Sequence, residues 1–186
     1  MVSLTVCIKI GYCRAFLQVY PSRSLQGISP LQVTPGGYVL VKSILAADDD
    51  YDYQLIIRLT LEAAGFKGSL NIVENGEDLM DFLHHQCKHP GAEIPDLIIL
   101  DLDMPRKDGR EALKEIKADP DLKSIPIVVL LISSPEEDQL CREFDCSFIQ
   151  KPDSYSQWVN TMEAILKFYG NDNENSKRPY FDDLLP

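Results

Sequence analysis

The chain has 186 residues, which suits one domain with tails, and its apolar content of 45% is that of an ordinary globular protein. Its formal net charge of −11 argues against nucleic-acid binding driven by bulk electrostatics. No apolar stretch approaches the roughly 18 to 20 residues of a membrane span, and five cysteines without framework spacing predict reduced thiols and a cytoplasmic location.

The N-terminal segment differs in charge from the rest of the chain. Residues 1 to 47 contain four basic residues and no acid, so the remainder carries a net charge of −15. This shift predicts a domain boundary near Pro35-Gly36-Gly37. Because residues 1–38 show no sustained helical or strand period, we expect a disordered extension or an artefact of an upstream start site. In either case this segment is expected to be dispensable for folding.

From residue 39 to residue 170, short apolar runs alternate with amphipathic stretches. The runs predict strands at Val39–Ala47, Leu70–Glu74, Leu97–Asp101, Ile127–Leu131 and Ser147–Ile149. The amphipathic stretches predict helices at Asp52–Ala64, Glu77–Cys87, Gly109–Ala118, Pro135–Phe144 and Asp153–Tyr169. In the first helix, one apolar face is expected to contain Leu55, Ile56, Leu59 and Ala63. Residues 171–186 form an acidic tail.

Five such β-α units predict an α/β domain with a doubly wound parallel sheet. Right-handed crossovers then permit the flavodoxin-like strand order 2-1-3-4-5. In such open sheets, ligands bind just outside the carboxyl ends of the strands. The residues that follow each apolar run are therefore the first candidates for a functional site.

Acidic residues follow two of these runs. Leu97–Leu100 ends at Asp101, and the first strand ends at Asp48-Asp49-Asp50. Carboxylates brought to one sheet edge repel each other and raise their own pKa values unless a cation compensates them. Hard oxygen ligands with no cysteine or histidine nearby favour Mg²⁺. Lys151, after the last strand, adds one positive charge to this acidic edge.

Three motifs together give the chain a family resemblance. They are the acid pair Asp48-Asp49, the LDLDMP segment around Asp101, and Lys151-Pro152. From about residue 41 to residue 169 the chain resembles the receiver domain of two-component response regulators. Two further stretches, PRKDGREALKEIKADPDLKSIPIVVL and His84 to Ile94, are most similar to single-domain regulators paired with phytochrome-type histidine kinases.

The resemblance implies that Asp101 accepts a phosphoryl group from a histidine kinase or a phosphotransfer protein. Asp49 and Asp101 would bind Mg²⁺ directly, Asp48 would hold a metal-bound water, and the backbone carbonyl of Asp103 would complete the shell. Lys151 would pair with Asp101 and then with the phosphoryl oxygens. Asp50 and Asp52 read as helix-start residues rather than ligands.

The output expected of such a protein is protein–protein contact, with no enzymatic activity. One form of that contact is a homodimer through the face made by residues 135–144, 147–149 and 153–169. This surface follows from the family alone.

One position departs from the family pattern. The family places Thr or Ser at the end of the fourth strand, and this chain has Leu131 there. Phe148 occupies the family's aromatic switch position, although a plain strand aromatic explains it equally well. Because Leu131 lacks a hydroxyl, we expect phosphorylation to survive and switching to be weak.

Two other interpretations remain open. Asp101-Leu102-Asp103 also resembles the DxD pair of haloacid-dehalogenase-type phosphatases, in which Asp101 would attack and Asp103 would act as general acid. Such enzymes place the nucleophile strand early, whereas here the acid pair at residues 48 and 49 comes first. The other interpretation is a degenerate receiver that binds partners without phosphorylation.

Overall fold

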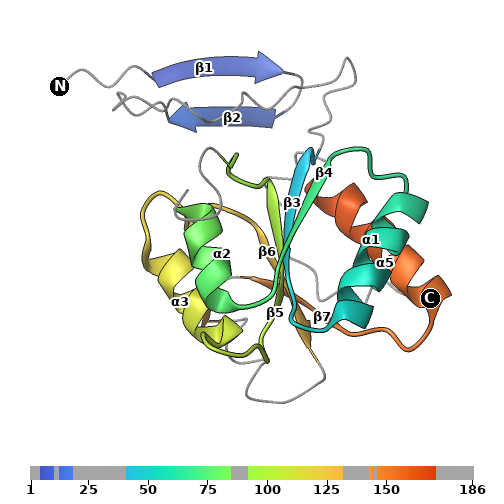
Figure 1. Ribbon diagram of the computed structural model, residues 1–186. Coiled ribbons are helices and arrows are strands. Elements are labelled where there is room, and N and C mark those ends of the chain that lie inside the picture. Colours follow the sequence, from blue (N-terminus) through green and yellow to red (C-terminus); the bar gives the residue numbers. More distant parts are fainter. Residues whose placement is uncertain are drawn as a thin grey trace.

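The computed structural model describes residues 5–10, 13–18, 41–84, 92–131, 143–144 and 146–170. The strands of its larger sheet are β3 (Ser43–Ala47), β4 (Ser69–Val73), β5 (Leu97–Asp101), β6 (Ile127–Leu131) and β7 (Ser147–Gln150). The helices are α1 (Tyr51–Ala63), α2 (Gly76–Leu83), α3 (Gly109–Ala118) and α5 (Tyr155–Tyr169). The sheet lies in the middle, with helices on both sides (Figure 1).

The sheet confirms the predicted topology. Its strands lie in the order β4-β3-β5-β6-β7, and every neighbouring pair is parallel. Counted along the domain, this is the order 2-1-3-4-5. Three of the strands, β3, β5 and β6, are buried at every position. Such burial on both faces explains why their sequences are unbroken apolar runs rather than alternating ones.

Each face of the sheet carries one pair of helices. α1 packs against α5 on one side, and α2 packs against α3 on the other (Figure 1). Alternate residues of the central strands enter the two cores: Ile99 of β5 faces the α1–α5 side, and Leu100 faces the α2–α3 side. The sheet therefore separates two hydrophobic cores and leaves its ends free for polar residues.

The predicted inner face of α1 is confirmed only at Ile56, which is partly buried against the core, and is wrong at Leu55, Leu59 and Ala63. The side chains buried on this helix are Ile57, Thr60 and Leu61, whereas Leu55 and Leu59 are 42% and 43% exposed. The helix carries apolar residues over most of its circumference, so spacing alone does not identify the inner face. A threonine takes a core position because its hydroxyl donates to the backbone carbonyl of Ile56 at 2.6 Å.

Several boundaries differ from the predicted ones by a few residues. β3 begins at Ser43 rather than at residue 39, and α2 ends at Leu83 rather than at residue 87. The predicted bounds of β5, α3 and β6 are confirmed. Most of the predicted helix at residues 135–144 and all of the acidic tail lie outside the described residues.

The N-terminal segment contains two strands that the sequence analysis did not expect. β1 (Thr5–Ile10) and β2 (Cys13–Gln18) pair antiparallel in a separate two-stranded sheet. Val6, Ile8 and Ile10 alternate with other residues, and this period of two is the signal that could have predicted the first strand. The dispensability of residues 1–38 for folding stays a prediction.

Candidate functional site

Three carboxylates meet at the carboxyl end of the sheet. β3 and β5 are neighbours, with Ala47 paired to Leu100, so the acids at the ends of both strands meet at one edge. Oxygen atoms of Asp48, Asp49 and Asp101 all lie within 4.8 Å of one another. Asp48 and Asp101 are buried, and Asp49 is exposed. The structure thus brings together the three acids that the sequence singled out.

Asp48 is held tightly on the protein side of this cluster. Its backbone N–H donates to the carbonyl of Val73 at 3.1 Å. Its carboxylate accepts from the backbone N–H of Asp50 at 2.9 Å. Burial raises the pKa of Asp48 above its usual value, against the opposing effects of that hydrogen bond and of Lys151. The ionised form of Asp48 therefore depends on nearby positive charge.

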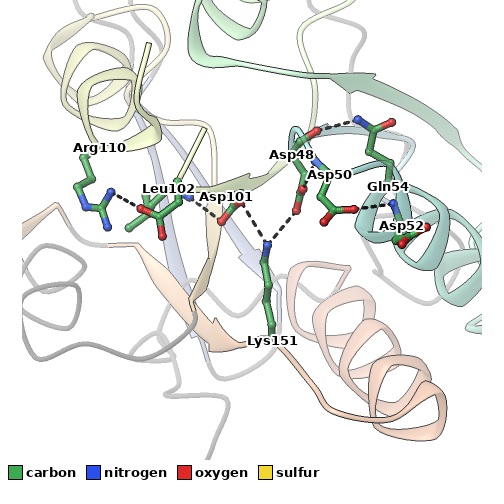
Figure 2. Close-up of polar contacts among 9 residues, drawn as sticks. Asp48, Asp50, Asp52, Gln54, Asp101, Leu102, Arg110 and Lys151 are labelled. Carbon is green, nitrogen blue, oxygen red and sulfur yellow. Dashed lines mark hydrogen bonds and ion pairs between the residues drawn. The ribbon is translucent and has the colours of Figure 1, made fainter. Parts of the chain in front are cut away.

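Lys151 bridges the two buried acids. Its Nζ lies 3.2 Å from Asp48 Oδ2 and 3.2 Å from Asp101 Oδ2 (Figure 2). Burial disfavours the charged lysine, but attraction to Asp48 and Asp101 outweighs this effect and raises the pKa of Lys151 above its usual value. Its backbone N–H donates to the carbonyl of Leu131 at 2.8 Å, which fixes the place where the side chain starts.

Asp101 ends β5, directly before a tightly turned loop. Its Oδ1 accepts from the backbone N–H of Leu102 at 2.9 Å, and Oδ2 faces Lys151. The loop then folds back, and a Cβ at Gly109 would lie 2.1 Å from the backbone carbonyl oxygen of Asp101. Only glycine allows this approach, so Gly109 helps to set the path of the backbone that carries Asp101.

The other acids of the loops have structural partners. Asp50 caps α1 by accepting from the backbone N–H of Asp52 at 2.8 Å, which agrees with their prediction as helix-start residues. The Asp103 carboxylate pairs with Arg110 at 2.9 Å and is largely exposed. This ion pair does not favour Asp103 as the general acid of a phosphatase. That the backbone carbonyl of Asp103 binds the metal ion stays a prediction.

The donor set at this edge fits a hard divalent cation. Three carboxylates and one ammonium leave a net charge of −2, and the carboxylate oxygens are close enough to share one ion. Among the described residues, no histidine or cysteine joins this cluster. Oxygen donors alone suit Mg²⁺, Mn²⁺ or Ca²⁺ rather than a soft metal.

The two predicted switch residues are buried in the hydrophobic core. Leu131 ends β6 and is 3% exposed, and its neighbour Leu130 pairs with Asp101. Phe148 in β7 is 7% exposed and belongs to the same hydrophobic cluster as Leu131. The role of both residues as switch positions stays a prediction.

Tyr53 is a site neighbour that no sequence pattern predicted. The Lys151 Nζ lies 3.8 Å from the centre of the Tyr53 ring, a cation–π contact. Trp158 of α5 also contacts this ring, with the two ring centres 6.2 Å apart. No motif marks Tyr53, because its role depends on the distance between α1 and the end of β7.

The comparisons with known proteins agree with this geometry. The family described as the response regulator receiver domain matches residues 44–155, which is more than half of the chain. The chain belongs to this family. Receiver domains serve in two-component signalling by phosphorylation, they bind a divalent metal ion, and those of phytochrome response regulators pair with histidine kinases.

Among curated receiver proteins, the chain is similar to the response regulator Rcp1 of Synechocystis. The two are 41% identical over 97 residues, which is 52% of this chain and 66% of Rcp1. It also resembles a probable methanogenesis regulatory protein, FilR2, of Methanothrix harundinacea, with 31% identity over 129 residues, 68% of this chain and 82% of FilR2.

Solved receiver structures extend the similarity to phytochrome regulators. The alignment with the Mn²⁺-bound form of Rcp1 covers 74% of this chain and 99% of the Rcp1 chain, with a TM-score of 0.64 and 33% identity. The alignment with the phosphorylated cyanobacterial phytochrome response regulator RcpA covers 69% of this chain and 94% of the RcpA chain, with a TM-score of 0.62 and 33% identity. The predicted receiver fold and the resemblance to phytochrome regulators are confirmed. No described helix is long and apolar enough to span a membrane.

Proposed function

We propose that Asp101 of this receiver accepts a phosphoryl group from a phosphohistidine. The observation that carries the proposal is the pair of 3.2 Å contacts from Lys151 Nζ to Asp101 and Asp48, beside the acid cluster. A carboxylate oxygen of Asp101 attacks phosphorus, and the phosphorus–nitrogen bond breaks. The electron pair of that bond leaves with the imidazole, and an acyl phosphate remains on Asp101.

The resident ion is proposed to be Mg²⁺. Asp49 and Asp101 would bind it directly, Asp48 would bind it through a water molecule, and the backbone carbonyl of Asp103 would complete the protein ligands. When bound, the ion neutralises negative charge on the incoming phosphoryl oxygens. Oxygen-only donors and the exposure of Asp49 support an ion that retains several waters.

Lys151 is proposed to change partners during the reaction. Before transfer its ammonium group compensates Asp48 and Asp101. After transfer, the negative charge lies on the phosphoryl oxygens rather than on Asp101. Lys151 then donates to one of those oxygens while it keeps its contact with Asp48.

Phosphorylation with a small phosphodonor, followed by intact mass, tests these assignments. We expect one added phosphoryl group on the wild type with Mg²⁺, little without a divalent ion, and none on Asp101→Asn. A phosphoryl group on Asp101→Asn would show that another residue accepts it. Mg²⁺ binding can be titrated by Trp158 fluorescence, and we expect a lower affinity in Asp49→Ala than in the wild type. Identical titration curves for the two proteins would reject Asp49 as a ligand.

The partner is proposed to be a phytochrome-type histidine kinase in the cytoplasm, and the output to be protein–protein contact without enzymatic activity. The similarity to Rcp1 and RcpA supports this choice of kinase. A homodimer through β7, α5 and residues 135–144 is a further proposal. Phosphotransfer from candidate kinases, and sedimentation with and without phosphorylation, test the two parts separately.

The switch of this receiver is proposed to be weak. At the position where the family has a hydroxyl, Leu131 has no donor for the phosphoryl group, and Phe148 is already buried. A hydrogen bond to a charged acceptor contributes roughly 1.5–3 kcal/mol. Without this hydrogen bond, phosphorylation changes the equilibrium constant between the inactive and active states by about tenfold less, or by an even smaller factor.

Amide shifts with and without a beryllofluoride phosphoryl mimic test this weak switch. We expect smaller shifts across β7 and α5 in the wild type than in Leu131→Thr. Shifts of equal size in the two proteins would show that the hydroxyl is not required. Mass labelling of Leu131→Thr serves as the control that phosphorylation itself is retained.

A further inference from the structure

The Lys151 ammonium group has a third neighbour besides its two carboxylates. An ammonium has three N–H donors, and Asp48 and Asp101 each face one of them at 3.2 Å. The Lys151 Nζ also lies over the Tyr53 ring, 3.8 Å from the ring centre. The Lys151 side chain is only 6% exposed, so few other positions are open to this group.

The Tyr53 ring also packs against a buried aromatic side chain. Trp158 is 1% exposed and lies against Tyr53 with an angle of 47° between the ring planes. Trp158 belongs to the hydrophobic core between α1 and α5, and the partly buried Tyr53 packs against this core. The position of the ring is thus set by the packing of two helices and not by the flexible lysine.

We infer that Tyr53 is a positioning residue of the phosphorylation site, which holds the Lys151 ammonium group between Asp48 and Asp101. The face of an aromatic ring attracts a cation without accepting a proton or competing for the carboxylates. It therefore limits where Nζ can go and leaves its N–H groups to the acids. This inference rests on the proposed function of Asp101 and Lys151.

Two variants separate the ring from its hydroxyl. Tyr53→Phe keeps the aromatic face, so we expect it to keep most of the rate of Asp101 labelling by a small phosphodonor. Tyr53→Leu removes the face, and at the usual strength of a cation–π contact we expect the rate to fall by about threefold to tenfold. Tyr51→Leu is the matched control, because Tyr51 lies on the same helix and is 73% exposed.

A double-mutant cycle distinguishes positioning from a general effect on packing. In the background of Lys151→Ala, Tyr53→Leu should change the residual labelling rate no further. An equal loss in both backgrounds would show that Tyr53 acts on the fold and not through Lys151. If Tyr53→Leu does not fold, Tyr53→Met replaces it, because methionine adapts to irregular space.

The position of the lysine can be measured without any phosphorylation. A ring face above Nζ shifts the ε-methylene proton resonances of Lys151 upfield, so these should move downfield in Tyr53→Leu and stay in place in Tyr51→Leu. Unchanged resonances in Tyr53→Leu would overturn the inference even if Asp101 is labelled. Conversely, the wild type could show the upfield Lys151 resonances and yet not be labelled on Asp101. That result would reject the proposed function and leave the contact between Tyr53 and Lys151 established.

Discussion

The central strand β5 has an aspartate at each end, and the two carboxylates are compensated in different ways. At the amino end, Asp96 Oδ2 accepts from the backbone N–H groups of Lys42 and Ser43 at 2.8 and 3.0 Å. At the carboxyl end, Asp101 accepts from one backbone N–H and faces the side chain of Lys151. Backbone donors are fixed, whereas a lysine can follow a new negative charge. The comparison teaches that a structural aspartate can be held by backbone donors, whereas the proposed phosphoacceptor faces a charged side chain.

The largest expected effect separates these two aspartates directly. Asp101→Ala should abolish labelling by a small phosphodonor, because the attacking oxygen is gone. Asp96→Ala should be labelled like the wild type but lose about 1–3 kcal/mol of unfolding free energy, because two backbone donors lose their acceptor. Intact mass and urea unfolding measure the two quantities. Loss of labelling in a folded Asp96→Ala protein would contradict this division of roles.

A matched pair of glycines extends the comparison to the backbone. A Cβ at Gly68, near the amino end, would lie 2.0 Å from the carbonyl oxygen of Lys42, and one at Gly109 would lie 2.1 Å from that of Asp101. Each substitution by alanine should cost about 1–3 kcal/mol of unfolding free energy, because the backbone must shift. Only Gly109→Ala should also slow labelling. Equal labelling rates in the two folded variants would show that the position of Asp101 tolerates the shift.

The charge at the carboxyl end should appear in the pH dependence of stability. Burial raises the pKa of Asp48, so folding disfavours its ionised form. The resulting loss of unfolding free energy is absent at pH values below the ordinary pKa of 3.8. It grows as the pH rises from there through the raised pKa of Asp48. Without divalent ions, Asp48→Asn should therefore gain stability over the wild type as the pH rises, and added Mg²⁺ should narrow the difference. Urea unfolding of both proteins from pH 3 to pH 8 measures this difference in unfolding free energy. A difference that does not change with pH would contradict the raised pKa of Asp48.

The smallest effect concerns backbone strain. Gly65, between α1 and β4, has φ +87°, which glycine adopts freely. In the loop after β5, Arg106 has φ +63°, and it is the only non-glycine residue with positive φ in the described part of the chain. Arg106→Asn should raise the unfolding free energy by about 0.5–1 kcal/mol, because asparagine tolerates this conformation. Arg106→Ala, which keeps the strain, is the control and should show no such gain.

The sequence predicts the carboxyl end of the sheet better than it predicts the helix surfaces. The acids and Lys151 directly follow apolar strands, so strand order alone brings them together. The inner face of α1 could not be predicted, because Leu55 and Ile57 are equally apolar and only the position of the sheet distinguishes them. Tyr53 could not be predicted either, because its contact with Lys151 depends on three-dimensional packing between residues distant in the chain.

The bridge between Lys151 and Asp48 also has a consequence for folding. These residues lie 103 positions apart, and β7, which precedes Lys151, is an edge strand that pairs with β6. Contacts of such long sequence separation form slowly, because closing the loop costs conformational entropy before the contact can compensate it. A chain whose β7 has not docked therefore carries the acids at residues 48, 49 and 101 without their lysine. When this last strand docks, Lys151 changes the net charge of this edge from −3 to −2.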